Sequence, residues 1–330
     1  MAEISYDVLG IGNAIVDVLA PAEDAFLEEH DMAKGAMTLI DAVRAEELYA
    51  AMGAGTERSG GSAANTVAGG AALGGRSCFV GKVRDDQLGR IFAHDIRAVG
   101  VDFHSAPATG GAPTARCLIS VTPDAKRTMN TFLGACVELG PEDVDEDLVA
   151  SSAVTYLEGY LWDPEGAKEA FLKAMGAARA AGRKVALSLS DGFCVDRHRD
   201  EFLDLVEHHV DILFANEDEI TSLYQVDNFD AAMQSVRGHC EIAALTRSEK
   251  GAVIVAGEEV HIIDAEPVDR IIDTTGAGDL YASGFLTGMT AGRELPECGR
   301  MAGIAAAEVI SHMGARPEAD LMALMKEKLG

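Results

Sequence analysis

A glycine-rich turn brings together the residue types needed to transfer a phosphoryl group. Residues 273–279 read DTTGAGD, and an apolar-periodic segment continues from Asp279 to Gly288, which predicts a turn at the start of a helix. The glycines at 276 and 278 let an anion approach the backbone, where free N–H groups and the helix dipole favour negative charge. Asp279 then stands where an acceptor hydroxyl would arrive, and its carboxylate can take the hydroxyl proton.

The longer pattern DTTGAGDxxxSGFL resembles the C-terminal signature of the ribokinase-like family, the phosphofructokinase-B type sugar and nucleoside kinases. The resemblance implies that Asp279 is the catalytic base. It also implies that three consecutive small residues form an anion hole: Gly276, Ala277 and Gly278.

A first group of candidate substrate residues follows a predicted strand at residues 6–12. If the chain stays extended, Asn13, Ile15 and Asp17 lie on one face. An amide and a carboxylate on one face can hold a pair of vicinal hydroxyls. GNxxxD after the first strand is similar to the substrate-binding opening of adenosine and related kinases, which implies that Asn13 and Asp17 bind ribose hydroxyls.

A second glycine-rich stretch, SGGSAANT at 59–66, opens a predicted helix that continues through Ala72. Small residues leave backbone N–H groups open to a polar ligand, and an asparagine side chain offers both a donor and an acceptor. The stretch resembles the family's N-terminal substrate motif, and four residues match it by position: Gly60, Gly61, Ser62 and Asn65.

Residues 114–132 predict a β-hairpin with a turn at 122–126. Together with residues near 14–40, we expect it to form a small sheet that acts as a lid and excludes water from the site. A guanidinium can neutralise phosphate oxygens. The resemblance to the lid arginine of adenosine kinases implies that Arg127 lies beside the transferring phosphate, and a solvated hairpin arginine is the alternative.

Beyond residue 140, short apolar runs alternate with helical patterns. Strands are predicted at 154–160, 184–189 and 211–215, and helices at 164–181, 199–208, from 217, and at 301–312. This alternation predicts a mainly parallel sheet covered on both faces. The resemblance implies a ribokinase-like three-layer α/β/α fold, with a large domain of residues 1–13, 41–106 and 136–330 and a small β lid of residues 14–40 and 107–135.

The predicted nucleotide site lies at the carboxyl edge of this sheet, where open α/β sheets bind ligands. Asn216 follows a strand and suits a helix N-cap. In the family that the chain resembles, the motif NxxE, here Asn216 to Glu219, helps hold Mg²⁺ through water. The resemblance therefore implies that Glu219 contacts the ion through a water molecule. Residues 246–251 resemble the TxGxxG nucleotide loop, with Thr246 and Gly251 in place and Ser248 replacing the first glycine.

In many members of the family, the start of the DTTGAGD loop also binds a monovalent cation. The resemblance makes Asp273 and Thr275 candidate ligands for potassium. Residues 314–317, GARP, are expected only to close the core.

Composition excludes several classes of partner. The 330 residues carry 27 Lys and Arg against 54 Asp and Glu, a net charge of −27, which argues against nucleic acid and anionic membranes. The N-terminus lacks the pattern of a signal peptide and no apolar run reaches the length of a membrane span, so a cytoplasmic protein is expected. Six scattered cysteines indicate free or buried thiols.

The resemblance covers nearly the whole chain and implies a kinase that uses ATP and Mg²⁺ to phosphorylate a primary hydroxyl. The N-terminal motifs are most similar to the adenosine kinase branch, so adenosine is the expected acceptor and AMP the product. A sugar kinase acting on ribose, fructose or 2-keto-3-deoxygluconate is one alternative, and a catalytically silent nucleoside sensor is another. The sequence is compatible with both a monomer and a homodimer. Four residues are candidates for the walls of a purine pocket, and each is equally a candidate for the core: Tyr160, Leu161, Trp162 and Phe193.

Overall fold

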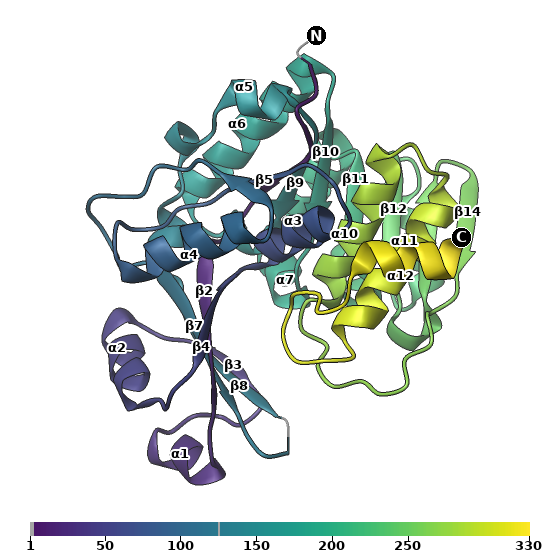
Figure 1. The fold of residues 1–330 in the computed structure, drawn as a ribbon. Helices are drawn as coiled ribbons and strands as arrows, with labels where there is room; N and C mark the ends of the chain where they lie inside the picture. Colours follow the sequence, from purple (N-terminus) through teal and green to yellow (C-terminus); the bar gives the residue numbers. More distant parts are fainter. Residues whose placement is uncertain (1–2, 125) are drawn as a thin grey trace.

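The chain forms two β-sheets, of which the larger lies inside a layered α/β domain and the smaller projects from it (Figure 1). The computed structural model describes residues 3–124 and 126–330. The three-layer α/β fold expected from the sequence is confirmed.

The large sheet has the order β14-β13-β12-β11-β10-β9-β1-β5-β6. Its neighbouring strands are parallel except for β12–β13 and β13–β14. The strands are β1 Tyr6–Ile11, β5 Ser77–Val80, β6 Val101–Phe103, β9 Ser152–Glu158, β10 Lys184–Ser188, β11 Ile212–Asn216, β12 Ile242–Thr246, β13 Ala252–Ala256 and β14 Glu259–Ile263.

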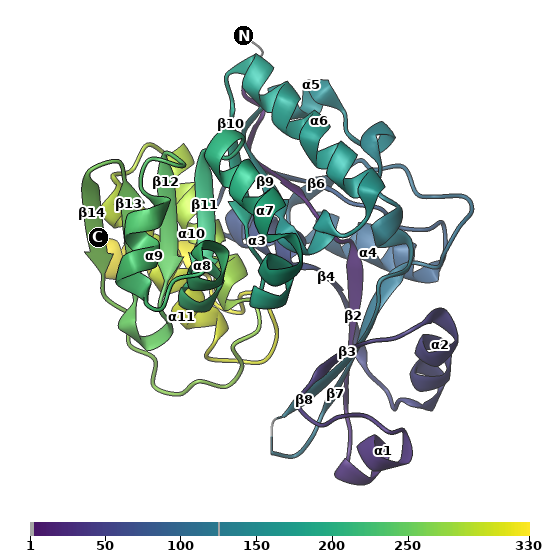
Figure 2. The same cartoon turned by 180° about the vertical axis from the view of Figure 1, so that it is seen from behind.

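Both faces of this sheet are buried because alternate strand residues pack into separate cores. Leu187 and Leu213 belong to one core, whereas Ala186 and Phe214 belong to the other. The helices toward the viewer in Figure 1 are α3 Ser62–Ala72, α4 Gln87–Ala98, α10 Ala277–Thr290, α11 Leu295–Val309 and α12 Leu321–Leu329. Those toward the viewer in Figure 2 are α6 Glu165–Ala181, α7 Gly192–His208, α8 Glu217–Tyr224 and α9 Phe229–Val236. The short helix α5, Glu146–Ala150, packs on α6.

The small sheet has the order β3-β8-β7-β2-β4. Its strands are β2 Ile15–Pro21, β3 Met37–Leu39, β4 Thr56–Gly60, β7 Ala115–Val121 and β8 Arg127–Phe132. The predicted hairpin is confirmed, since β7 and β8 pair antiparallel; Ala125 of its predicted turn lies outside the described residues. Helices α1 Asp24–Glu29 and α2 Ala42–Ala51 flank the sheet in Figure 1.

The structure differs from the expected division of the chain at β4. Residues 41–106 were expected in the large domain, yet Thr56–Gly60 pairs with β2 as an edge strand of the small sheet. The sequence of β4, TERSG, has no apolar alternation: the strand runs from an exposed threonine to two small buried residues, Ser59 and Gly60.

Two helices begin earlier than predicted. Helix α7 starts at Gly192 because the Asp191 side chain accepts a hydrogen bond from the Cys194 N–H, and its two helical pieces join at His198. Helix α11 starts at Leu295, with a proline in its first turn. Residues 270–272, which lead into the DTTGAGD turn, form no strand.

Candidate active site

Asp279 lies in the first turn of α10, where this helix meets the start of α3. Its carboxylate accepts hydrogen bonds from Ser62 Oγ at 2.6 Å and from Asn65 Nδ2 at 2.9 Å. Burial raises the pKa of Asp279, and these two hydrogen bonds together with the charge of Arg316 oppose the rise. The structure therefore joins three of the predicted site residues, although Asp279 lies 217 and 214 positions from the other two.

The glycine turn has the conformation that the sequence predicts. Gly276 is the N-cap of α10, with a φ of 80°, and a Cβ at this position would lie 2.7 Å from the Cβ of Ala315. Only glycine fits both conditions. Ala277 and Gly278 follow as the first helical residues. The Ala277 N–H donates to the Thr274 carbonyl at 3.2 Å, and the Gly278 N–H has no partner within the helix.

Asp17 lies on β2 next to the end of β4. A side chain at Gly60 would clash with the Asp17 carboxylate, and Gly61 continues as the N-cap of α3. Burial raises the pKa of Asp17 to about 6; the charges of Arg316 and Arg127 oppose this rise, and that of Asp279 adds to it. The carboxylates of Asp17 and Asp279 thus face one site together with two arginines.

Glu158 is a buried residue of this site that the sequence analysis missed. It ends β9, is 1% exposed, and accepts hydrogen bonds from Asn13 N at 3.1 Å, Asn13 Nδ2 at 2.5 Å and Ala63 N at 2.7 Å. Burial raises its pKa to about 7, against the effect of these donors. The amide oxygens of Asn13 and Asn65 are buried and have no hydrogen-bond partner among the described residues. A charged residue at the end of an apolar strand was the available signal for Glu158.

Arg127 reaches from β8 to the start of the DTTGAGD loop. Its Nη1 lies 2.8 Å from Asp273 Oδ2 and 3.1 Å from Thr275 Oγ1. The Arg127 side chain is 8% exposed, so it is not a solvated surface arginine. Its Nε and Nη2 atoms are buried without a partner among the described residues, which leaves donors for a ligand.

Asp273 and Thr275 do not fit a monovalent-cation site in this arrangement. Asp273 accepts hydrogen bonds from Thr275 N at 3.1 Å, from Thr275 Oγ1 at 2.8 Å and from Gly314 N at 2.9 Å. Arg127 supplies the positive charge. Three donors and a guanidinium already satisfy this carboxylate, and we derive no step through a bound cation.

The predicted nucleotide residues gather at the ends of two adjacent strands, since Asn216 pairs with Thr246. Asn216 and Glu219 form a capping box, with Asn216 N donating to Glu219 Oε2 and Glu219 N donating to Asn216 Oδ1, both at 2.9 Å. Asn216 Nδ2 also donates to Glu219 Oε1 at 2.6 Å. Burial raises the pKa of Glu219 to about 7. Ser248 has a φ of 51°, a conformation that favours glycine, and Gly251 ends the turn.

Two of the four candidates for a purine wall lie in the core, which is the other place that the sequence allowed for them. Leu161 and Trp162 are 0% and 4% exposed, and the Trp162 ring packs against Phe171 and Phe202 in the core. Phe193 is 78% exposed.

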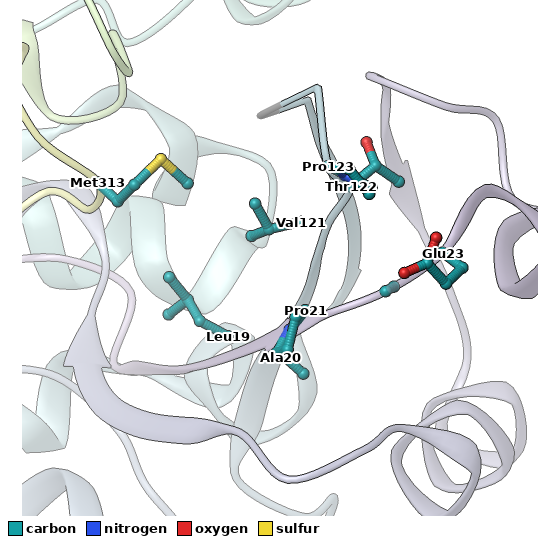
Figure 3. A pocket seen from close by; sticks show the side chains of 9 residues that line it. Leu19, Ala20, Pro21, Glu23, Val121, Thr122, Pro123 and Met313 are labelled. Carbon is teal, nitrogen blue, oxygen red and sulfur yellow. The ribbon is translucent and has the colours of Figure 1, made fainter.

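An apolar cavity of about 650 Å³ lies instead between the lid and the loop that follows α11. Leu19 and Val121 on the lid lie opposite Met313 (Figure 3). Leu19 is two residues beyond Asp17 on β2 and therefore lies on the same face of the lid.

A glycine turn at a helix start, a carboxylate beside it and a β-sheet lid define a phosphotransferase that acts on a hydroxyl group. A profile of the family described as pfkB family carbohydrate kinase matches residues 32–321, and the chain belongs to this family. Among the residues that the structure describes, no helix is long and apolar enough to cross a membrane.

Two solved structures are similar over nearly the whole chain. An adenosine kinase from Sinorhizobium meliloti is 55% identical, with 98% of this chain and 99% of that chain covered and a TM-score of 0.90. A probable sugar kinase from Rhizobium etli CFN 42 is 53% identical, with 98% of each chain covered and a TM-score of 0.91. A 5-dehydro-2-deoxygluconokinase from Geobacillus thermodenitrificans is 26% identical, and the match covers 78% of this chain and 79% of that protein. The chain is thus a carbohydrate or nucleoside kinase.

Proposed function

We propose that the protein transfers the γ-phosphate of ATP to a primary hydroxyl of adenosine, forming AMP. The observation that carries this proposal is the apolar cavity on the same lid face as Asp17. A nucleoside needs hydroxyl-binding groups beside a wall for a flat base, whereas a simple sugar has nothing to fill an apolar cavity. The 55% identity to a protein named adenosine kinase supports the same acceptor.

On the acceptor side, Asp17 and Asn13 hold the ribose hydroxyls, and Asp279 takes the proton of the attacking hydroxyl. Ser62 and Asn65 each donate to one Asp279 oxygen, so they fix the carboxylate and stabilise its ionised form. Gly60 lets the Asp17 carboxylate approach the backbone closely, and Gly61 leaves room for the Asn13 carbonyl. The new oxygen–phosphorus bond forms as the bond to the leaving ADP oxygen breaks.

On the phosphate side, we assign the N–H groups at Gly276 and Gly278, at the start of α10, to the transferring group. The Ala277 N–H donates to the Thr274 carbonyl at 3.2 Å, so Ala277 holds the turn of the anion hole in shape. Arg127 offers two unpaired N–H donors to the same group. These donors stabilise the negative charge of the transition state.

On the nucleotide side, we assign the binding of ATP to four residues: Asn216, Thr246, Ser248 and Gly251. Bound Mg²⁺ neutralises phosphate charge. Glu219 fits a contact to it through water, because both Glu219 oxygens already accept hydrogen bonds from Asn216 and Mg²⁺ keeps several of its waters.

The test is ADP release with Mg-ATP and a panel of acceptors: adenosine, inosine, ribose, fructose, 2-keto-3-deoxygluconate and 5-dehydro-2-deoxygluconate. Turnover with adenosine at micromolar concentration supports the proposal, and turnover with a sugar alone overturns it. Leu19→Asp places a charge in the cavity and should lower kcat/KM for adenosine by about 100-fold, since burying an unpaired charge is costly. Val43→Asp, at an exposed helix position, is the matched control.

The Asp279→Asn variant tests the alternative that the protein is a catalytically silent nucleoside sensor. In a kinase, turnover should fall by about 1,000-fold or more while adenosine still binds, because only proton removal is lost. Asp85→Asn, which changes a surface carboxylate, is the control.

A further inference from the structure

The loop between α11 and α12 packs directly on the glycine turn, although its sequence matches no motif of the site. Gly314 N donates to Asp273 Oδ2 at 2.9 Å, and Ala315 is the residue that excludes any side chain at Gly276. Arg316 comes next. The loop therefore brings a second guanidinium to the site, from a different segment of the chain than the hairpin that carries Arg127.

One nitrogen of Arg316 is anchored and two are free. Nη2 donates to the Ser59 carbonyl at 3.0 Å and contacts Ser59 Oγ at 3.2 Å, while Ser59 Oγ donates to Asp95 at 2.6 Å. The Nε and Nη1 atoms are buried and have no hydrogen-bond partner among the described residues. A buried N–H donor of a charged group that lacks a hydrogen-bond partner lowers the stability of the protein, unless a ligand supplies the missing acceptor.

The charges around Arg316 come from four separate elements. Asp95 on α4, Asp17 on β2 and Asp279 on α10 favour its charged form, whereas Arg58 on β4 opposes it. Burial lowers the pKa of Arg316 to about 10, so it stays charged at neutral pH. Asp279 also faces Glu158. A cation fixed by Ser59 thus lies beside both carboxylates that the proposed reaction uses.

We propose that Arg316 is a second cation for the transferring phosphoryl group, which it binds through Nε and Nη1 while Arg127 binds from the lid. Arg127 and the loop that carries Arg316 meet at one carboxylate oxygen, because Asp273 Oδ2 accepts from both Arg127 Nη1 and Gly314 N. Negative charge that builds on the phosphoryl oxygens between ATP and the acceptor hydroxyl meets a guanidinium on each side. This inference rests on the proposed kinase function and on Asp279 as the base.

The first experiment compares the affinities of AMP and adenosine by calorimetry, with no turnover required. Arg316→Gln should weaken the binding of AMP by about 30-fold or more and that of adenosine by less than about threefold, since only AMP carries the phosphate. Equal weakening of the two ligands, or none, would overturn the proposal. Arg300→Gln, an exposed arginine on α11, should change neither affinity.

The second experiment measures the reaction itself. Arg316→Gln should lower kcat by about 100-fold or more, with the KM for adenosine nearly unchanged. Arg316→Lys should be intermediate, because an ammonium retains the charge without the planar fork. Free guanidinium ion should restore part of the activity of Arg316→Ala and none of that of Asp279→Asn.

The pH profile separates a direct role from a structural one. Loss of the Arg316 charge should raise the pKa of Asp279, so the acid limb of kcat/KM should move to higher pH in Arg316→Gln. If Arg316→Gln lowers kcat but leaves the acid limb of kcat/KM at the same pH, and guanidinium ion restores no activity to Arg316→Ala, the role of Arg316 is structural only. If the wild-type protein turns over no acceptor, the kinase assignment fails, while the comparison of AMP with adenosine still decides whether Arg316 binds phosphate.

Discussion

Arg127 of the lid and Asp273 of the large domain form a buried ion pair, with 2.8 Å between Nη1 and Oδ2. Their side chains are 8% and 7% exposed, so solvent screens the pair weakly. The pair ties the hairpin that carries Arg127 to the loop that carries the anion hole.

Removing one partner of this pair should destabilise the protein, because the other charge stays buried. Arg127→Gln is expected to lower the free energy of unfolding by about 3 kcal/mol, and the double variant Arg127→Gln, Asp273→Asn should recover about half of that loss. Urea denaturation of the wild type, both single variants and the double variant measures the coupling. Additive losses in the double variant would contradict a direct interaction.

The same pair predicts that the enzyme does not require potassium. Arg127 and three further donors satisfy Asp273, so no carboxylate oxygen is left for a cation. Turnover in a buffer whose only monovalent cation is tetramethylammonium should be within about twofold of that in potassium, since an ion without a site has no coupling to the reaction. Activation of tenfold or more by potassium would mean that Asp273 exchanges Arg127 for the ion during turnover.

Ser248 is held in a backbone conformation that suits glycine, with a φ of 51°. Ser248→Gly should therefore raise the free energy of unfolding by about 1 kcal/mol, measured by urea denaturation. Ser248→Ala keeps the Cβ and should give no such gain, which makes it the matched control. If both variants gave the same stability, the strain would not come from the side chain.

The sequence was sufficient for the fold class and for residues that sit in contiguous motifs. Short apolar strands alternating with helices indicated the parallel sheet, and Ser62, Asn65 and Asp279 each belong to a glycine-rich pattern. Glu158 and Arg316 were missed because their partners lie 145 and 257 positions away and no local pattern marks either residue. The polar edge strand β4 was missed because hydrogen bonding to β2, and not apolar alternation, makes it a strand.

Substrate binding should weaken as the pH falls through the pKa of Asp17, which burial raises to about 6. A protonated carboxyl accepts hydroxyl hydrogen bonds poorly, so the KM for adenosine should rise below about pH 6. Asp17→Asn should have a high KM that is nearly independent of pH between 5 and 8. A wild-type KM that stays flat across this range would argue against Asp17 as a ribose ligand.

Glu158 makes stability depend on pH in the opposite sense to an exposed ion-paired carboxylate. Its pKa rises from 4.5 to about 7 because burial favours the neutral form, so the folded state binds the proton more tightly than the unfolded state does. The contribution of Glu158 is therefore most favourable below about pH 4.5 and is lost as the pH rises to about 7, a change of about 3 kcal/mol. Glu158→Gln removes this titration.

The measurement for Glu158 is the difference in unfolding free energy between pH 5 and pH 8, because the amide also lowers the absolute stability by facing the donors of Asn13 and Ala63. The wild type should lose about 2 to 3 kcal/mol more than Glu158→Gln over this interval. Glu258→Gln, at a fully exposed position, should behave as the wild type. Equal slopes in the wild type and Glu158→Gln would mean that Glu158 stays ionised in the folded protein, held by its three donors against the cost of burial.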